Sequence, residues 1–430
     1  MWSARCYLIE LFEPINMHIL FLTDNFPPEV NAPASRTFEH CREWVKAGHQ
    51  VTVITCAPNF PKGKIYSGYK NRLWQHEKIA GIQVIRVWTY IAANKDFLKR
   101  SLDYLSFVPT AFLASLFVRK VDLVIGTSPQ FFTVCVAYLT GMCKRVPWVF
   151  ELRDIWPESI RVVSAMNQVN ILNLLERLEL YLYGKANLIV SVTHSFRERL
   201  MLRAVNVDKI KVITNGVDLS SFCPRVKDVN LLEFYDLKDK FVIGYIGTHG
   251  LAHALEVIIE AATLFKNTDD YYRFRFILIG DGAEKVGLKQ QVELKGLSNI
   301  IFVESVPKDQ IIRYWSILDV SIIHLKRNEL FETVIPSKLF ESMAMGIPVL
   351  HGVAGESTRI VIENDVGVCF EAENPNDLVS KIKNVATDKD LYQKLRSNGP
   401  KAALIYDRKI LAEEMLKLLT TINNINKINN

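Results

Sequence analysis

The chain has 430 residues, a formal net charge of +6 and 49% apolar residues. Single hydrophobic cores stop growing near 250–300 residues, so this length predicts two domains. The charge excess is modest, and Arg/Lys-rich helices, zinc-ligand spacings and aromatic-basic interleaving are absent, which argues against nucleic acid as a partner. The seven cysteines include no C-x-x-C pair, so we expect reduced thiols in a cytosolic compartment.

The first sixteen residues make a poor signal peptide, because Glu10 and Glu13 interrupt the short apolar stretch that follows Arg5. We expect residues 1–16 to be a disordered extension or to follow from an upstream start codon, and the fold to begin at Met17. The longest apolar run, 104–118, contains Pro109 and is shorter than the roughly 20 residues that cross a bilayer.

The first half alternates β-rich runs with helix-length segments. A strand at 18–23 is followed by a proline-rich loop at 24–33 and by a helix that starts near Ser35 and that Gly48 ends. Further strands are expected at 51–56, 82–87, 123–127, 148–152, 188–192 and 210–213. This order is typical of a parallel sheet covered by helices.

A second series of the same kind begins after a polar stretch that follows residue 218. Strands are expected at 241–247, 274–279, 300–303, 320–324, 348–350 and 368–370. The two series predict an α/β protein with two Rossmann-like, doubly wound domains, 17–215 and 216–400, that face a central cleft. Residues 401–422 are expected to form a C-terminal helix that packs back on the N-terminal domain, and 423–430 a frayed polar tail.

The turn after the first strand of the second domain is rich in glycine. Gly247, Thr248, His249 and Gly250 lead from this strand into a helix, so backbone N–H groups there can approach a diphosphate. A purely structural turn remains an alternative, and residues 280–282 are read as a tight turn.

The segment from Thr333 to Pro348 is the most informative part of the chain. Pro336 and Ser337 suit the start of a helix whose free N–H groups bind sugar hydroxyls or phosphate, and Lys338 adds a positive charge. Glu341 follows one turn later, within reach of a ribose. The Lys326-Arg327 pair can add phosphate contacts. Alternatively, these are surface residues of an amphipathic helix.

Charged residues also follow the strand at 148–152 in the first half. Arg153, Asp154 and Glu158 stand beside a Trp-Pro pair, and charges at the carboxyl end of a parallel strand face the cleft. We therefore predict a catalytic role for these three, with a loop-shaping ion-pair network as the alternative. The residues His194 and Ser195 indicate a helix start with Ser195 as its cap.

One segment of the first half has the composition of a membrane-surface helix. Phe97, Leu98, Leu102, Leu105 and Phe107 can rest on an anionic membrane, although a buried helix has the same pattern. The flanking basic residues are Lys95, Lys99, Arg100, Arg119 and Lys120.

From residue 17 to about 419, the chain resembles the retaining glycosyltransferases of family 4, whose two-domain fold is called GT-B. The resemblance depends on the sequence runs at 48–54, 212–218 with Phe222, and 340–349. The Arg-Asp-Ile-Trp-Pro-Glu run at 153–158 looks like a subgroup from O-antigen and capsule clusters that is often labelled N-acetyl-L-fucosamine transferases.

This resemblance implies a UDP-sugar donor in the second domain, an acceptor in the first, and transfer with retention of the anomeric configuration without a metal or other cofactor. Acceptor contacts are expected from Pro28, Asn31 and Ala32. The expected donor contacts are Gly247, Thr248, His249, Lys326, Thr333, Pro336, Ser337, Lys338 and Glu341.

The chain departs from the family pattern in three places. Two glutamates separated by seven residues are usual, but Thr333 occupies the first position, with Glu332 beside it. A histidine that is common after the first-domain strand is replaced by Arg153. The usual basic pair after the glycine turn is missing, so Lys326 and Lys338 are the candidates to supply its charge.

We therefore predict a cytoplasmic glycosyltransferase, peripheral at the inner face of a bacterial plasma membrane, that extends a lipid-linked oligosaccharide for O-antigen, capsule or exopolysaccharide. A UDP-N-acetylhexosamine 2-epimerase of the same architecture is one alternative, although it needs paired acid-base groups around the donor sugar. A non-catalytic nucleotide-sugar-binding protein is another.

Overall fold

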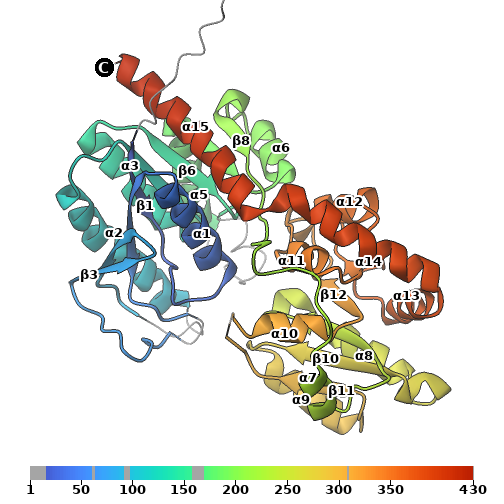
Figure 1. Cartoon of the computed structure of the whole chain (residues 1–430). Coiled ribbons are helices and arrows are strands. Elements are labelled where there is room, and N and C mark those ends of the chain that lie inside the picture. The colour runs from blue at the N-terminus through green and yellow to red at the C-terminus, as the bar shows by residue number, and fades with distance from the viewer. Residues whose placement is uncertain (1–15, 61–62, 92–96, 157–168, 308, 430) are drawn as a thin grey trace, which may run out of the picture.

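The computed structural model describes residues 16–60, 63–91, 97–156, 169–307 and 309–429, which form two α/β domains (Figure 1). Residues 1–15 of the expected extension at 1–16 lie outside the described residues. Met17 is fully buried, and its N–H donates to His49 Nδ1 over 3.2 Å. The prediction of two Rossmann-like domains is confirmed.

The N-terminal domain contains an eight-stranded sheet of order β3-β4-β2-β1-β5-β6-β7-β8. Every neighbouring pair is parallel except β3 and β4. Most of its strands are apolar throughout because helices cover both faces. The elements are β1 (His18–Leu22), α1 (Ala32–Lys46), β2 (Gln50–Cys56), β3 (Trp74–Ile79), β4 (Ile82–Val87), α2 (Phe97–Phe117), β5 (Leu123–Thr127), α3 (Phe131–Lys144), β6 (Trp148–Leu152), α5 (Val169–Lys185), β7 (Leu188–Ser191), α6 (His194–Leu202), η1 (Val207–Lys209) and β8 (Ile210–Val212).

Strand β3 was not predicted from the sequence. Its residues Trp-Gln-His-Glu-Lys-Ile alternate too weakly between apolar and polar to stand out, and it pairs only with β4 at the edge of the sheet. Ala80 and Gly81, both with positive φ, turn the chain between the two strands. Polar side chains on an edge strand discourage pairing with other molecules.

The C-terminal domain has a six-stranded sheet of order β11-β10-β9-β12-β13-β14. Its first strand, β9, lies in the middle, so the strand order reverses between β9 and β12, where such sheets bind ligands. The elements are α7 (Val229–Phe234), β9 (Phe241–Ile246), η2 (Leu251–His253), α8 (Glu256–Leu264), η3 (Asp269–Tyr272), β10 (Phe274–Ile279), α9 (Lys285–Leu294), β11 (Ile300–Val303), α10 (Ile311–Ser316), β12 (Val320–His324), η4 (Phe331–Thr333), α11 (Lys338–Met345), β13 (Val349–Gly352), α12 (Glu356–Glu363), β14 (Gly367–Cys369), α13 (Pro375–Thr387) and α14 (Lys389–Ala403).

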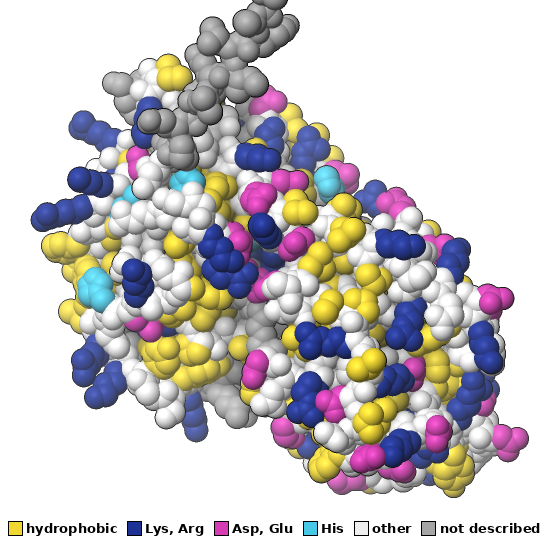
Figure 2. All heavy atoms as spheres, in the orientation of Figure 1, with side chains coloured by type: hydrophobic (Ala, Val, Ile, Leu, Met, Phe, Trp, Pro, Cys, Tyr) yellow, Lys and Arg dark blue, Asp and Glu magenta, His cyan; other side chains and the backbone are white. Residues whose placement is uncertain are grey.

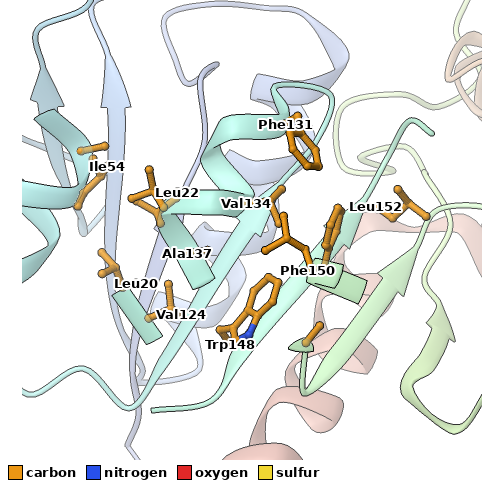
Figure 3. Close-up of a cluster of buried hydrophobic side chains, with 14 of the residues drawn as sticks. Leu20, Leu22, Ile54, Val124, Phe131, Val134, Ala137, Trp148, Phe150 and Leu152 are labelled. Atoms are coloured by element: carbon orange, nitrogen blue, oxygen red, sulfur yellow. The ribbon is translucent and has the colours of Figure 1, made fainter. Parts of the chain in front are cut away.

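Large apolar side chains lock the helices of the N-terminal domain onto its sheet. Figure 3 shows Val134 and Phe131 of α3 beside Phe150 of β6, with Leu22 of β1 in the same cluster. Because close-packed cores resist displacement, the carboxyl ends of these strands hold fixed positions.

The chain ends in a long helix, α15 (Arg408–Asn429), which returns to the N-terminal domain and packs on α1 (Figure 1). Trp44 Nε1 donates to the Ala412 carbonyl over 2.9 Å, and Met415 is fully buried in the N-terminal core. The helix starts later than 401, because α14 continues through Pro400 and Asp407 then breaks the helical path with extended backbone.

The expected frayed tail at 423–430 is wrong for residues 423–429, which continue α15. Asn423 is 1% exposed, and Lys427 pairs with Asp122 of the N-terminal domain over 3.3 Å. Tertiary contacts therefore hold this polar sequence in a helix.

Two chain crossings connect the domains and run side by side. Val217, after β8, forms a parallel bridge with Asp407, which follows η5 (Leu404–Tyr406). A Cβ atom on Gly216 would lie 2.1 Å from the Tyr406 carbonyl oxygen, so only glycine allows this approach. The paired crossings form the connection behind the cleft.

The proposed membrane helix corresponds to the N-terminal part of α2. Leu102 and Leu105 are about half exposed, but Phe107 is fully buried in the core, so the expected apolar face is only partly free. Within the described ranges, no helix has both the length and the apolar character needed to span a bilayer. On the face drawn in Figure 2, basic side chains are interspersed with acidic ones over both domains.

Candidate active site between the domains

A cleft lies between the two domains and encloses about 1350 Å³ of space unfilled by atoms, including the part open to solvent. The N-terminal wall comes from the start of α1 and from the loop after β2, and the C-terminal wall from the ends of β9 and β10 and the start of α11. The lining residues are Val30, Asn31, Ala32, Ser35, Phe60, Tyr66, Phe222, Ile246, Gly247, Thr248, Ile279, Gly280, Asp281, Gly282, Ser305, Val306, Ile311, Ser337, Glu341 and Arg408.

Two glycine turns form the centre of the C-terminal wall. Gly247 and Gly280 have φ values of +147° and +142°, and a Cβ on Gly280 would lie 1.9 Å from the Gly247 carbonyl oxygen. The His249 N–H donates to the Asp281 carbonyl over 2.9 Å, which ties the turns together. Both positions require glycine, and the turns leave Gly247 and Thr248 facing the cleft.

The first turn of α11 faces the same space. Ser337 precedes the helix without a side-chain cap and lines the cleft together with Glu341. Helix N-termini carry N–H groups without intrahelical partners and a partial positive charge, so this end favours an anion. Ser337 and Glu341, which were predicted as donor contacts, thus lie in the cleft wall, and their donor role stays a prediction.

Lys338 places an ammonium group beneath the glycine turn. Its Nζ is buried 3.7 Å from the centroid of the Tyr245 ring and has no hydrogen-bond partner among the described residues. A Cβ atom on Gly247 would be 2.8 Å from this Nζ. Burial lowers the pKa of Lys338 from its ordinary value of 10.5 to about 7, with Glu341 opposing this shift. A buried cation that lies directly behind the turn without a hydrogen-bond partner is suited to an anionic ligand.

The neighbouring histidines carry no charge at neutral pH. Burial lowers the pKa of His249 to about 4 and that of His253 to about 3, with smaller contributions from nearby cationic groups such as Lys338. Both ring nitrogens of His249 are buried without a partner in the part of the chain that the structure describes. Neither His249 nor Lys338 belongs to the cleft lining. Lys338 lies behind the Gly247 turn, and Lys285 donates to the carbonyl of the adjoining Gly280 over 2.7 Å.

Four other predicted contacts lie outside the lining of the cleft. Lys326 is exposed after β12, and its N–H donates to the Ala252 carbonyl. Thr333 ends η4 and donates its hydroxyl to the Leu330 carbonyl over 2.6 Å, while Pro336 precedes the lining residue Ser337. Pro28 is exposed beside the N-terminal wall.

Asn31 and Ala32 do line the N-terminal wall, as predicted for acceptor contacts. The Asn31 side chain is already used by the fold, because its Oδ1 caps α1 through the Ala34 N–H at 2.9 Å and its Nδ2 donates to Asn25 Oδ1 at 2.7 Å. Asn31 therefore fixes where α1 begins, and helix α1 starts three residues before the predicted Ser35.

Arg153 and Asp154 follow β6 but do not line the cleft, and Glu158 lies outside the described residues. The Ser128 hydroxyl accepts the N–H groups of both residues, at 2.8 and 3.2 Å. Burial lowers the pKa of Arg153 to about 10 and raises that of Asp154 to about 7. The ring of Trp156, two residues after Asp154, stacks on that of Phe131 with 4.6 Å between the centroids. Part of the run at 153–158 therefore packs in the hydrophobic core.

A buried arginine network, which the sequence did not predict, surrounds Arg153. Arg36 of α1 donates to Glu151 over 2.9 Å and to the Ile213 carbonyl over 2.9 Å. Arg408 of α15 donates to Glu39 and to the Gly216 carbonyl. Both arginines connect α1 to the domain crossings. In the sequence, the position of Arg36 does not distinguish it from an arginine on the surface of a helix.

A carboxylate from the C-terminal domain caps a helix of the N-terminal domain. Glu356 of α12 accepts the N–H groups of His194 and Ser195 at 3.0 and 2.7 Å, and it is 6% exposed. Thr193, rather than the predicted Ser195, is the residue that caps α6, through the Phe196 N–H. The contact joins the two domains beside the crossings.

Comparison with protein families divides the chain along these two domains. Residues 34–221 match the family model "Glycosyltransferase Family 4", and residues 233–402 match "Glycosyl transferases group 1".

Relatives of known name are similar over long stretches. The chain is 25% identical over 384 residues to the putative colanic acid biosynthesis glycosyl transferase WcaI of Escherichia coli K12, covering 85% of this chain and 91% of that protein. It is 24% identical over 256 residues to the putative teichuronic acid biosynthesis glycosyltransferase TuaH of Bacillus subtilis 168, covering 58% and 62%.

Solved structures share the two-domain fold. Sucrose-phosphate synthase from Thermosynechococcus elongatus superposes with a TM-score of 0.74 at 16% identity, covering 95% of this chain and 99% of that one. Anabaena HepE in complex with UDP and glucose gives a TM-score of 0.71 at 17% identity, with coverage of 94% and 100%.

Proposed function

The chain is a GT-B glycosyltransferase, with a family 4 N-terminal half and a group 1 C-terminal half, and from this premise we propose that it transfers a sugar from a UDP-sugar to a lipid-linked saccharide, with retention of configuration. The single observation that carries the donor assignment is the unpartnered ammonium of Lys338 behind the Gly247 turn. A nucleotide diphosphate supplies the missing anion.

Uridine is the proposed base because Anabaena HepE, a structural neighbour, is described in complex with UDP and with UDP-glucose. In this placement the diphosphate lies against Gly247 and the N-terminus of α11, with the Lys338 ammonium behind the turn, and Glu341 takes the ribose. The transferred sugar then points toward Thr333, where family 4 usually has a glutamate. The resemblance of residues 153–158 suggests an N-acetylated amino sugar, N-acetyl-L-fucosamine among them.

The proposed reaction depends on charge stabilisation. The bond between the anomeric carbon and the diphosphate breaks on the face where the acceptor oxygen attacks, and the acceptor proton passes to the departing diphosphate. Lys338 and the α11 N-terminus stabilise the charge that develops on the leaving group. The two walls hold donor and acceptor in contact.

A lipid-linked acceptor at the inner face of the plasma membrane fits the exposed side of α2. Leu113, Leu116 and Phe117 are each more than 40% exposed, and the exposed residues Arg119 and Lys120 follow directly. Apolar side chains flanked by cations suit the surface of an anionic bilayer. The names of WcaI and TuaH, which refer to colanic and teichuronic acid, support a place in surface-polysaccharide synthesis.

The alternatives of an epimerase and a non-catalytic sensor are less well supported, because both matched family models describe glycosyl transferases. Incubation with a UDP-sugar alone separates transfer from epimerisation, since only an epimerase converts the donor into its isomer.

The donor assignment is tested by release of UDP from a panel of UDP-sugars in the presence of a bacterial lipid extract. Lys338→Ala and Glu341→Ala are expected to abolish turnover. The exposed Lys326, replaced in the same way, is the matched control and should leave turnover unchanged. Full activity of the Lys338 and Glu341 variants would contradict the assignment.

A further inference from the structure

The N-terminal wall of the cleft presents two aromatic side chains that the sequence analysis did not select. Phe60 is 38% exposed and lines the cleft, and Tyr66 lines it as well. Both lie in the loop that follows β2, on the wall opposite the glycine turn at Gly280. Large aromatic side chains left exposed in a cleft commonly contact a ligand.

The backbone of Phe60 is fixed from two sides by distant side chains. Its N–H donates to Glu29 Oε1 over 2.8 Å, and its carbonyl accepts the Tyr66 hydroxyl over 2.6 Å. Glu29 Oε1 also accepts the Asn59 N–H over 2.8 Å. The backbone at Asn59 and Phe60 is held in place, while the Phe60 ring is left open to the cleft.

Glu29 performs this task at an energetic cost. The residue is 4% exposed, and burial raises the pKa of its carboxyl group to about 7, although the N–H groups of Phe60 and Asn59 oppose the shift. A buried ionisable group is unfavourable unless it is well satisfied. Such perturbed groups are concentrated where the position of neighbouring atoms matters for function.

The chemistry of this wall favours an uncharged ligand with an apolar face. Among its described lining residues, the N-terminal domain contributes no acidic or basic side chain: they are Val30, Asn31, Ala32, Ser35, Phe60 and Tyr66. Arg408 also lines the cleft, but its guanidinium is bonded to Glu39 and to the Gly216 carbonyl. A pyranose ring offers hydroxyl groups at its edge and C–H groups on its face, which suits this surface.

We propose that Phe60 and Tyr66 form the platform on which an uncharged pyranose ring of the acceptor rests, and that Glu29 is the positioning residue that holds Phe60 there. This inference rests on the proposed function, because it takes the opposite wall as the donor site. It deepens that function by assigning a neutral sugar, rather than a uronic acid, to the acceptor residue nearest the donor.

The test uses two simple glycosides as probes, methyl β-D-glucopyranoside and its uronic acid, methyl β-D-glucopyranosiduronate. With the protein saturated with UDP, saturation-transfer NMR should detect contacts from the ring C–H groups of the neutral glycoside and at least tenfold weaker binding of the uronate. Phe60→Ala should weaken binding of the neutral glycoside about tenfold and leave UDP binding unchanged. Phe234→Ala, which removes an exposed ring on α7 outside the cleft, is the matched control.

Glu29 is tested by two substitutions of different size. Glu29→Gln keeps an oxygen that can accept both N–H groups, so glycoside binding should persist. Glu29→Ala removes that acceptor and should weaken glycoside binding as much as Phe60→Ala, again with normal UDP binding. Equal effects of the two Glu29 substitutions would contradict the positioning role.

The outcomes separate the inference from its premise. If the wild-type protein fails to bind UDP, the proposed function is wrong. If UDP binds but the glycoside gives no signal, or its signal is unchanged in Phe60→Ala, the platform is wrong. A preference for the uronate would overturn the assignment of a neutral ring.

Discussion

Replacing Lys338 with methionine should have opposite effects on stability and on donor binding. Lys338 Nζ is buried against Tyr245 and has no hydrogen-bond partner among the described residues, and the charge of Glu341 offsets only part of its burial. Methionine retains the length of the side chain and removes the charge. We expect Lys338→Met to stabilise the protein without ligand and to weaken its binding of UDP.

The magnitude follows from the pKa of Lys338, which is lowered from 10.5 to about 7. This difference corresponds to an upper bound of about 5 kcal/mol on the cost of keeping the buried amine charged. Below pH 7 the amine is charged in both the folded and the unfolded protein, so the full cost is present. Between pH 7 and about 10.5 the folded protein releases the proton first, and the cost falls as the pH rises. The stability gain of the methionine variant should therefore be largest below pH 7.

Donor binding should also take up a proton. Because the pKa of Lys338 lies near 7, most of the protein without ligand holds a neutral amine at pH 8. A bound diphosphate favours the charged form, so UDP binding should take up a proton at pH 8 and much less than one at pH 6. Loss of a hydrogen bond to a charged group costs about 1.5–3 kcal/mol, so Lys338→Met should bind UDP roughly 10- to 150-fold more weakly at pH 6.

Titration calorimetry in phosphate and in Tris buffer at pH 8 measures the proton uptake, because the two buffers differ in ionisation enthalpy. Thermal unfolding without ligand at pH 6 and pH 9 measures the stability difference. Equal binding heats in both buffers, or wild-type affinity in the methionine variant, would show that the Lys338 ammonium does not bind the diphosphate.

Three further changes test other parts of the structure. Glu356→Ala leaves two helix N–H groups without their carboxylate, so the free energy of unfolding in urea should fall by about 2 kcal/mol. Replacing Glu363, at the far end of α12, should have little effect. Equal effects of the two changes would contradict the interdomain cap. Gly280→Ala places a methyl group 1.9 Å from the Gly247 carbonyl oxygen and requires alanine to adopt a positive φ, so UDP binding should be lost. Normal UDP binding in titration calorimetry would contradict the need for glycine at this position. The wild-type Glu29 carboxyl has a folded pKa near 7, above its ordinary 4.5, so the wild-type protein loses stability as the pH rises from 4.5 to 7. Glu29→Gln does not ionise, so its free energy of unfolding should exceed that of wild type by an amount that grows over this range to about 3 kcal/mol. A difference that does not depend on pH would contradict the burial of the carboxyl group.

The sequence was sufficient for most of the fold because the buried strands are short apolar runs. Strands β5, β6, β10, β11 and β12 lie where the pattern predicted them. Edge strand β3 was missed, since its mixed composition carries no period-2 signal. The end of α15 was also missed, because its helical state depends on contacts such as Lys427 with Asp122 rather than on its own polar sequence.

The candidate site was predicted where local sequence determines geometry. Glycine turns and a Pro-Ser helix start are local features, so Gly247, Ser337 and Glu341 were predicted as contacts, and they lie together in the lining of one cleft. Lys326 and Lys338 were equal candidates for the missing charge, and only the fold separates an exposed lysine from a buried one.

Contacts between residues far apart in the chain could not be predicted from the sequence. Arg36 meets Glu151 across 115 positions, and Glu356 reaches His194 across 162. Spacing along the chain carries no signal for such pairs. Phe60 was missed for the same reason, because its importance depends on Glu29, a residue of a different loop.

Transfer of a sugar from a nucleotide diphosphate to a lipid-linked saccharide in the cleft changes the mass of that saccharide, so mass spectrometry tests it. The purified chain is incubated with a UDP-sugar panel and a bacterial lipid extract, and the lipid-linked saccharides are analysed by mass spectrometry. We expect a lipid-linked product that is heavier by one hexosyl or N-acetylhexosaminyl residue, formed together with UDP and absent with Lys338→Ala. Conversion of the UDP-sugar into an isomer without any change in lipid mass would contradict it.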